Sequence, residues 1–183
     1  MDIGLSWDFF GDKIDLDATV VMLDDLGQIV DAVYYNKLVS DCGGLVHSGD
    51  NRDGAQDGFD ELIKINLAMV NFKVNYLALI INSYNGEGLD KVETATCSIM
   101  SNGAKIHQSM IGGRSDSNAS MAGIIYRRNG VWSFMDSSDK GPGKVFTECE
   151  TLIKDNLTKC GLDPVLLAET QGWNASNAKK FVL

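Results

Sequence analysis

Acidic and amide side chains are concentrated in one short segment of the chain. Residues 49–61 read Gly-Asp-Asn-Arg-Asp-Gly-Ala-Gln-Asp-Gly-Phe-Asp-Glu, so five acids and one arginine share thirteen residues. Hard cations such as Ca²⁺ bind six to eight oxygen atoms from carboxylates, amides and main-chain carbonyls. A Gly/Asp/Asn loop supplies all three kinds of oxygen, and its glycines permit tight turns. The composition therefore indicates either a calcium site or a solvated surface loop.

The spacing of these acids departs from the EF-hand calcium loop. Asp50 and Glu61 stand at the separation of EF-hand positions 1 and 12. However, Arg52 occupies the third position, and Ala55 stands where that motif requires glycine. The segment is therefore not an EF-hand.

Two further aspartates interrupt an apolar stretch nearer the N-terminus. In residues 14–19, apolar side chains alternate with Asp15, Asp17 and Thr19. Alternation in a strand directs the two aspartates to one face. That face is either exposed to solvent, or it lies beside the 49–61 loop, where a cation would neutralise charges that are otherwise expensive to bury.

The overall charge narrows the classes of partner. The chain has 183 residues with 25 acids against 16 bases, a net charge of −9. Nucleic-acid binding and polybasic membrane binding need a cationic surface, so we expect neither, and we expect cations instead. No apolar run approaches the roughly 20 residues of a membrane span, and the N-terminus lacks the pattern of a secretory signal. With four widely spaced cysteines expected to be free thiols, these features predict a cytoplasmic location.

The elements that must position these residues are predicted to be mostly strands. Turn signals such as Ser101-Asn102-Gly103 and Arg128-Asn129-Gly130 separate short apolar runs, which indicates hairpins. Recurrent hairpins without a strand–helix alternation favour an all-β, antiparallel β-sandwich. The predicted strands cover residues 14–23, 28–35, 76–82, 94–100, 104–110, 121–127 and 131–135.

The last forty residues change character and predict helices. One apolar face is formed within residues 144–160 by Val145, Cys149, Leu152, Ile153 and Leu157. Asp163-Pro164 starts a second short helix, running to about Gln171. We therefore expect a β-sandwich over residues 1–140 and a C-terminal α-helical appendage and tail over residues 144–183. The apolar face either packs on the sandwich or docks another protein.

Sequence motifs of catalysis are missing. There is no Gly-x-Ser-x-Gly string, and His47 and His107 are the only histidines that could serve a Ser–His–Asp arrangement. The string Gly141-Pro142-Gly143-Lys144 is followed by Val145, where a phosphate loop requires Ser or Thr. We expect no enzymatic activity, and we expect His47 to order the neighbouring acidic loop.

Several strings resemble the TerD family, whose members belong to tellurium resistance and stress response. The strings are Gly4-Leu5-Ser6-Trp7-Asp8, Ile14-Asp15-Leu16-Asp17-Ala18-Thr19, Tyr34-Tyr35-Asn36, His47-Ser48-Gly49-Asp50-Asn51 and Asp57-Gly58-Phe59-Asp60-Glu61. The string from Tyr126 to Phe134 is similar to the late hairpin of the family, so the resemblance covers residues 4–140. It implies a calcium-binding β-sandwich without catalytic turnover.

The resemblance also implies which residues hold the ion. The metal-ligand role falls on Asp15, Asp17, Asp50, Asn51, Asp57, Asp60 and Glu61. Six of these are carboxylates, so one Ca²⁺ leaves a charge of −4 and two leave −2, which favours two ions. Phe59 stands where the family commonly has an acid, which favours one ion. We expect one or two Ca²⁺ ions, and of these alternatives we choose two, with the second weaker.

The resemblance leaves one alternative function open. Some eukaryotic relatives are described as binding cyclic AMP, so the chain would then be a small-molecule (cyclic nucleotide) binding protein. In that case Arg114, or Arg127 and Arg128, would have to meet the phosphate.

Overall fold

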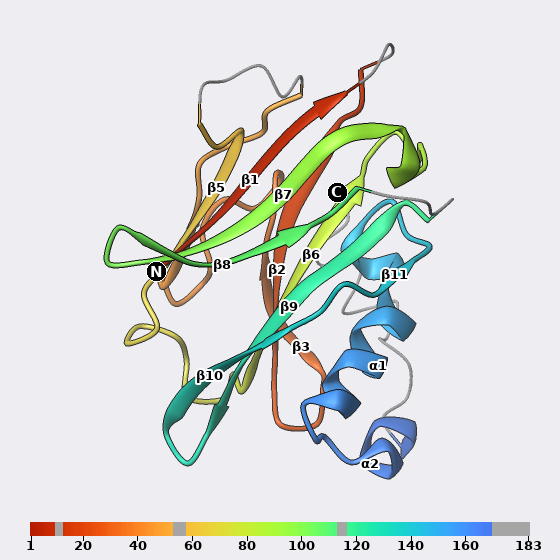
Figure 1. Cartoon of the computed structure of the whole chain (residues 1–183). Coiled ribbons are helices and arrows are strands. Elements are labelled where there is room, and N and C mark those ends of the chain that lie inside the picture. Colours follow the sequence, from red (N-terminus) through yellow and green to blue (C-terminus); the bar gives the residue numbers. More distant parts are fainter. Residues whose placement is uncertain (10–12, 53–57, 113–116, 170–183) are drawn as a thin grey trace.

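Two antiparallel β-sheets packed face to face form the body of the molecule (Figure 1). The computed structural model describes residues 1–9, 13–52, 58–112 and 117–169. Sheet A has the strand order β4 (Leu45–His47), β5 (Glu61–Ile65), β1 (Asp2–Phe9), β7 (Val92–Ser101) and β8 (Ala104–Met110). Sheet B has the order β10 (Val131–Asp136), β9 (Ala119–Arg128), β6 (Tyr76–Ser83), β2 (Leu16–Leu23) and β3 (Ile29–Val33), and β11 (Lys140–Gly141) pairs with β9.

The predicted hairpins are present, and the predicted fold class is confirmed. The turn between β7 and β8 contains Asn102 at φ 50° and Gly103 at φ 78°. The turn between β9 and β10 repeats this conformation with Asn129 at φ 50° and Gly130 at φ 78°. Two consecutive positive φ angles are what a tight antiparallel hairpin needs, and Asn-Gly supplies them at little cost.

Three strands of sheet A were not predicted. β1 lies in the middle of that sheet, between β5 and β7, although its segment was assigned no strand. Ile3, Leu5 and Trp7 point inward and are buried. The segment 49–61 was expected to be a loop; the short strand β4 precedes it, and its last residue, Glu61, is the first residue of β5.

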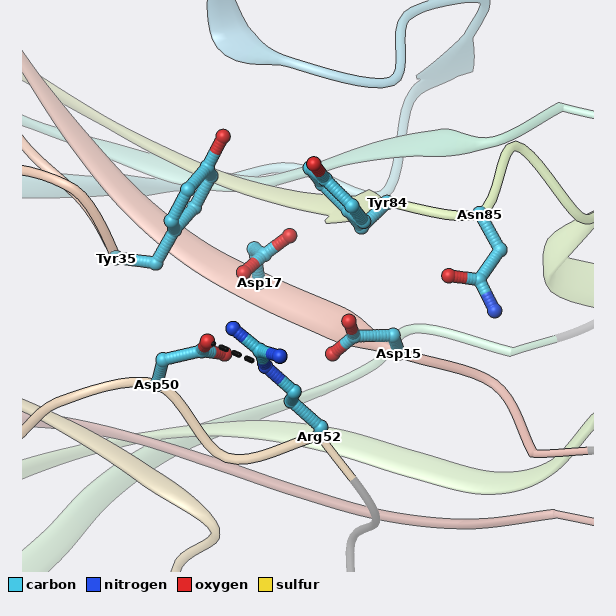
Figure 2. Close-up of a pocket in the computed structure, with 7 residues that line it drawn as sticks. All are labelled: Asp15, Asp17, Tyr35, Asp50, Arg52, Tyr84 and Asn85. Carbon is cyan, nitrogen blue, oxygen red and sulfur yellow. Dashed lines mark hydrogen bonds and ion pairs between the residues drawn. The ribbon is translucent and has the colours of Figure 1, made fainter. Parts of the chain in front are cut away.

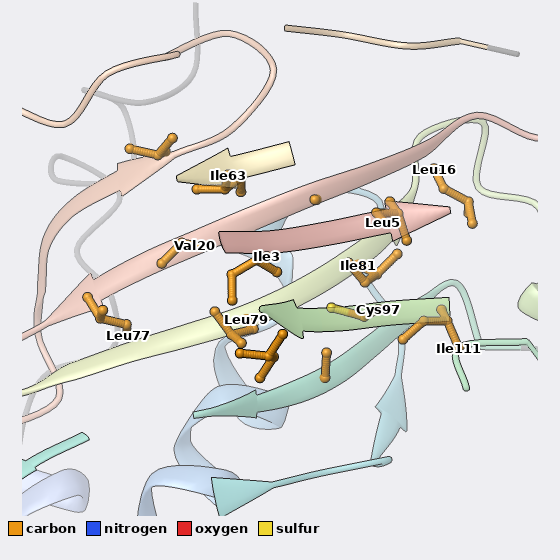
Figure 3. Close-up of a cluster of buried hydrophobic side chains, with 14 of the residues drawn as sticks. Ile3, Leu5, Leu16, Val20, Ile63, Leu77, Leu79, Ile81, Cys97 and Ile111 are labelled. Carbon is orange, nitrogen blue, oxygen red and sulfur yellow. The ribbon is translucent and has the colours of Figure 1, made fainter. Parts of the chain in front are cut away.

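The main hydrophobic core fills the space between the sheets (Figure 3). Ile3 and Leu5 of β1 face Val20 of β2 and Leu79 of β6, and all four are at most 2% exposed. Burying one such side chain stabilises the fold by about 1.5–3 kcal/mol. This core holds the ends of β2 and β5 in fixed positions, from which the candidate site is built.

The C-terminal helix α1 lies over the outer face of sheet B (Figure 1), and a second apolar cluster fills the space between them. Leu152, Ile153 and Leu157 of α1 (Glu150–Lys159) pack against residues of the sheet such as Val21 and Ile80. Of the two alternatives for the helical face, the structure shows packing on the protein's own sheet. Among the described residues, no helix is long and apolar enough to cross a membrane.

The helical region begins later than predicted. Residues 144–149 hold a 3₁₀ turn, Phe146–Glu148, and α1 begins at Glu150 instead of Lys144. Val145 is extended (φ −135°, ψ 156°), far from the helical angles of about −63° and −42°, so the α-helix does not begin at Lys144. Gly161, at φ 83°, follows Cys160 at the end of α1, where this left-handed conformation favours glycine.

The second predicted helix is also present. It is α2 (Pro164–Glu169), and Asp163 Oδ1 accepts a hydrogen bond from Val165 N at 2.9 Å. This is the N-cap role expected for Asp163. The predicted end of this helix near Gln171 and the predicted tail lie outside the described residues. One further 3₁₀ turn, Leu89–Lys91, precedes β7.

Candidate metal site

Three of the predicted ligands converge at the beginning of β2 (Figure 2). Asp15 and Asp17 flank Leu16, whose side chain is fully buried in the core. Asp50 reaches the same place from the loop that follows β4. One carboxylate oxygen from each of the three lies within 4.8 Å of the others. The sheet alternation and the loop together therefore create a compact group of oxygen donors.

The loop is turned toward β2 by its own glycine and by a buried histidine. Gly49 has a φ of 115°, a conformation that favours glycine, and its N–H donates to His47 Nδ1 at 3.0 Å. Ser48 N donates to Leu62 O at 2.8 Å, which ties the loop to β5. The hydrogen bond to Gly49 agrees with the ordering role expected for His47.

Two of the three carboxylates, Asp15 and Asp17, each have an oxygen atom without a hydrogen-bond partner among the described residues. Asp17 is only 4% exposed, and its Oδ2 has no hydrogen-bond partner among the described residues, nor has the buried Oδ1 of Asp15. Burial, together with the charges of Glu61, Asp15 and Asp50, raises the pKa of Asp17 to about 8. Burial followed by the Asp50 and Glu61 charges raises the pKa of Asp15 to about 6. A bound cation would supply what these oxygens lack.

One positive side chain stands at the mouth of the pocket. Arg52 Nε donates to Asp50 Oδ2 at 2.8 Å, and the Arg52 side chain is 79% exposed. The formal charges of Asp15, Asp17, Asp50 and Arg52 add up to −2, which one divalent cation would neutralise. An exposed ion pair of this kind is worth little by itself, so Arg52 does not replace such a cation.

The remaining walls of the pocket are aromatic and amide side chains. Tyr35 and Tyr84 line it with Asn85, and the two rings meet edge to face with their centroids 5.6 Å apart. The cavity is about 200 Å³. A water molecule occupies about 30 Å³ in the liquid, so the cavity has room for an ion with several coordinating waters.

Two other predicted ligands, Glu61 and Asn51, lie next to this cluster but are not among the described residues that line the cavity. Glu61 is fully buried, and its Oε2 accepts a hydrogen bond from Ala18 N at 2.7 Å and lies 3.4 Å from His47 Nε2. Its Oε1 accepts from Asn51 N at 3.4 Å. Glu61 therefore joins the acidic loop to the edge of β2, and it adds negative charge behind Asp17.

Of the last two predicted ligands, Asp60 lies apart from the cluster, and Asp57 lies outside the described residues. Asp60 precedes Glu61, and its Oδ2 accepts a hydrogen bond from Trp7 N at 3.0 Å. It lines a separate cavity of about 260 Å³ with Ser6 and Asp8. Asp57 lies outside the described residues. Neighbouring residues at the start of a strand point to opposite faces, which explains why Asp60 and Glu61 separate.

Comparison with known proteins decides the family. The TerD domain model matches residues 1–141. The chain belongs to the TerD family. The TerD match ends immediately before the segment that leads into α1.

Individual relatives agree with this TerD assignment. The chain is 35% identical over 147 residues to the tellurium resistance protein TerZ of Serratia marcescens, which covers 73% of this chain and 76% of that protein. It is 34% identical over 146 residues to general stress protein 16U of Bacillus subtilis (strain 168), covering 72% and 76%. A solved homologue of the telluride resistance protein TerD from Streptomyces coelicolor A3(2) superimposes with a TM-score of 0.71 at 17% identity, covering 79% of this chain and 91% of that one.

The arginines named for a phosphate are engaged elsewhere. Arg127 Nη2 donates to the main-chain carbonyls of Asn71, Phe72 and Val74. Arg128 Nη2 donates to Cys160 O. Arg114 lies outside the described residues. Nothing in the described part of this TerD domain therefore favours a cyclic-nucleotide site over a cation site.

Several residues of the pocket were not predicted. Tyr35 belongs to a string quoted for the family resemblance, but Tyr84 and Asn85 carried no signal of their own. They follow directly after β6, and only the pairing of β6 with β2 brings them beside Asp15 and Asp17.

Proposed function

We propose that this TerD-family protein binds Ca²⁺ through Asp15, Asp17 and Asp50 and acts as a calcium-dependent module in stress response or tellurium resistance. The observation that carries the proposal is the Oδ2 atom of Asp17, which is buried inside a group of three carboxylates and has no hydrogen-bond partner among the described residues. A charge in that position is costly unless a cation binds to it. The relatives named for tellurium resistance and general stress supply the biological setting.

The donor set favours Ca²⁺ among the common metal ions. The three side chains offer only carboxylate oxygens, which hard cations prefer. Ca²⁺ binds oxygen at 2.3–2.6 Å, so ligands on opposite sides of the ion lie about 4.6–5.2 Å apart, which accommodates oxygens that are within 4.8 Å of one another. Mg²⁺ requires a tighter octahedron at about 2.0–2.1 Å, so we expect it to compete poorly.

We propose binding without catalysis. The one arrangement of Ser, His and Asp side chains found in the described residues has Ser109 Oγ and Asp136 Oδ1 at 2.9 and 2.8 Å from the same atom, His107 Nε2. In a catalytic triad the two partners bind different ring nitrogens. This group joins β8 to β10, and it offers no proton relay.

We place the protein in the cytoplasm, because all four cysteines are free thiols.

Calorimetric titration of the chelator-treated protein with CaCl₂ tests the proposal. Wild type should bind Ca²⁺ with a measurable heat, and Asp17→Asn should weaken the affinity at least about tenfold, since one charged ligand is lost. Asp60→Asn is the matched control: the amide oxygen can still accept the hydrogen bond from Trp7 N, and the side chain lies outside the cluster.

The result separates two ligand sets. Unchanged affinity in Asp60→Asn supports the three-carboxylate site. Equal losses in both variants would show that the ligand set includes Asp60, and no heat in wild type would overturn calcium binding. The same titration gives the number of bound ions. The described residues form one group of three carboxylates, which accounts for one ion. A second, weaker binding step in the titration would correspond to a second ion.

A further inference from the structure

The rear wall of the candidate calcium site is formed by residues that follow, in the sequence, the part of the chain matched by the TerD model. Asp17 and Tyr35 line the acidic pocket, and both also line a narrow slot behind it. The opposite side of this slot is formed by Lys144, Val145 and Phe146. These residues follow position 141, where the TerD match ends, and lead directly into α1. The helical segment is therefore in contact with the site, although it packs mainly on sheet B.

Asn82 connects Asp17 to this segment. Asn82 of β6 is the register partner of Asp17 of β2, so the two side chains are neighbours on the same face of the sheet. Asn82 is 1% exposed, and its Nδ2 donates to Gly143 O at 2.7 Å and to Cys149 Sγ at 3.3 Å. Its Oδ1 is buried with no hydrogen-bond partner among the described residues, as is Oδ2 of Asp17. The carboxylate at the site thus rests against an amide that the C-terminal segment holds.

Aromatic side chains make a second connection. Tyr84 contacts Tyr35 with ring centroids 5.6 Å apart, and Tyr35 contacts Tyr34 at 5.3 Å. Tyr34 contacts Phe146 at 5.2 Å, all in edge-to-face geometry. The chain of rings begins at the wall of the acidic pocket and ends in the 3₁₀ turn before α1. Because packed side chains transmit strain to their neighbours, we expect a shift at one end of this chain of rings to reach the other.

A third contact places the loop of Tyr84 and Asn85 against the same segment. Gly86 follows them at φ 74°, and a Cβ at this position would overlap the side chain of Lys144. The absence of a side chain at Gly86 therefore lets Lys144 lie directly over the loop. Both walls of the pocket, Asp17 on β2 and Tyr84 with Asn85 after β6, are supported by residues 143–149.

We propose that calcium binding at Asp17 and docking of α1 on sheet B stabilise each other, with Asn82 as the positioning residue between them. This inference rests on the proposed function. An ion that fixes Asp17 and the neighbouring pocket wall also fixes the surface on which residues 143–149 lie. By thermodynamic linkage, docking of the segment increases Ca²⁺ affinity by the same factor by which Ca²⁺ favours docking.

Two variants of the full chain separate this coupling from general stability. Asn82→Ala removes the links to Gly143 and Cys149 and leaves the three proposed ligands in place. Leu167→Ala is the matched control, because Leu167 belongs to the same apolar cluster but lies beside Gly27, beyond the opposite end of β2. In CaCl₂ titrations we expect Asn82→Ala to bind about five- to tenfold more weakly and Leu167→Ala to stay within about twofold of wild type. A merely structural role for Asn82 would lower stability without this change in affinity.

Hydrogen exchange of the α1 amides supplies the reciprocal measurement. In wild type, saturating Ca²⁺ should slow exchange in Glu150–Lys159 by a factor similar to the affinity change, and Asn82→Ala should lose most of this effect. If Asn82→Ala does not fold, Phe146→Leu tests the same coupling by weakening the contact with Tyr34.

The outcomes are distinguishable. Wild type that gives no heat with CaCl₂ overturns the proposed function, and the coupling with it. Wild type that binds Ca²⁺, with unchanged affinity in the folded variant and unchanged exchange in α1, overturns the coupling alone. Weaker binding in Leu167→Ala equal to that in Asn82→Ala also overturns it, because the effect would then follow general stability.

Discussion

Asp17 and Asp31 are buried aspartates of the same sheet, and their surroundings are opposite. They are 4% and 3% exposed. Asp31 Oδ1 accepts hydrogen bonds from Ala32 N and Lys37 Nζ, and its Oδ2 accepts one from Asp41 N at 2.8 Å. Oδ2 of Asp17 has no partner among the described residues, and its nearest charges include the carboxylates of Glu61, Asp15 and Asp50.

The difference separates an acid that holds the chain together from an acid that we propose binds a cation. Burial lowers the pKa of Lys37, but its hydrogen bonds to Asp31 and Asp41 outweigh this effect, and the net pKa is raised. Lys37 therefore stays charged near neutral pH. At Asp17 the fold supplies negative neighbours instead. Burial alone therefore does not distinguish the two acids; the missing hydrogen-bond partner of Asp17 does, and it is the feature that needs an explanation.

The largest loss of stability should come from breaking the ion pair between Asp31 and Lys37. We expect Asp31→Asn to lower the free energy of unfolding of the metal-free protein by about 3 kcal/mol, because it leaves Lys37 without its buried counter-charge. The value lies at the low end of the range for buried pairs, since the Lys37 side chain is 28% exposed. Urea denaturation at neutral pH measures it. A loss below about 1 kcal/mol would remove the distinction drawn between the two aspartates.

The stabilisation of the protein by Ca²⁺ should depend on Asp17 and not on Asp31. At a free Ca²⁺ concentration one hundred times the dissociation constant, linkage predicts a gain of about 2.7 kcal/mol in wild type. For a chain of this size that raises the melting temperature by about 5–10 °C. Asp31→Asn should show the same gain from its lower starting point. Asp17→Asn, whose affinity should be at least about tenfold weaker, should gain at most about 1.4 kcal/mol at the same Ca²⁺ concentration. An equal gain in Asp17→Asn would show that the ion binds elsewhere.

Strands paired through short turns could be predicted from the sequence, and a strand with distant partners was not. Hairpins such as β7–β8 and β9–β10 are specified locally by Asn-Gly turns, and they were predicted. β1 was not, because its partners are residues 61–65 and 92–101, far along the chain. The alternation of Ile3, Leu5 and Trp7 is a local strand signal, but it does not identify these distant partners.

The residues of the candidate site likewise fall into those that were predicted and those that were not. Asp15, Asp17 and Asp50 were predicted from alternation and composition together with the family resemblance. Asp60 was assigned to the same ligand set, yet the strand directs it to Trp7 N. Tyr84 and Asn82 depend on the register between β6 and β2, which the sequence does not state. What was missed at the site is what only the tertiary structure brings together.

The stability of the metal-free protein should fall as the pH rises from about 5 to about 8. In the folded chain the pKa of Asp15 is raised to about 6 and that of Asp17 to about 8, while unfolded aspartate titrates near 3.9. The folded state therefore holds protons that the unfolded state has already released. Stability is then lost with rising pH, by at most about 1.4 kcal/mol per pH unit for each group.

Chemical denaturation across this pH range, in chelator, measures the slope. Asp17→Asn should flatten the slope above pH 6, and Asp31→Asn should leave it as in wild type. Saturating Ca²⁺ should also flatten it, because the ion holds the carboxylates in their charged form. A wild-type slope of opposite sign would mean that these carboxylates are stabilised as anions without any metal.

The smallest effect should come from the exposed partner of the same lysine. Lys37 Nζ contacts Asp41 Oδ1 at 2.8 Å as well as Asp31, but the Asp41 side chain is 83% exposed. Exposed ion pairs contribute about 0–1 kcal/mol, so Asp41→Asn should cost less than about 0.5 kcal/mol. The main-chain N–H of residue 41 still donates to Asp31 Oδ2, which preserves the loop. Urea denaturation at low salt and at about 1 M NaCl checks this, because screening should remove even the small difference. A loss as large as that of Asp31→Asn would show that the three charges act as one unit, and then burial would not be what distinguishes Asp31.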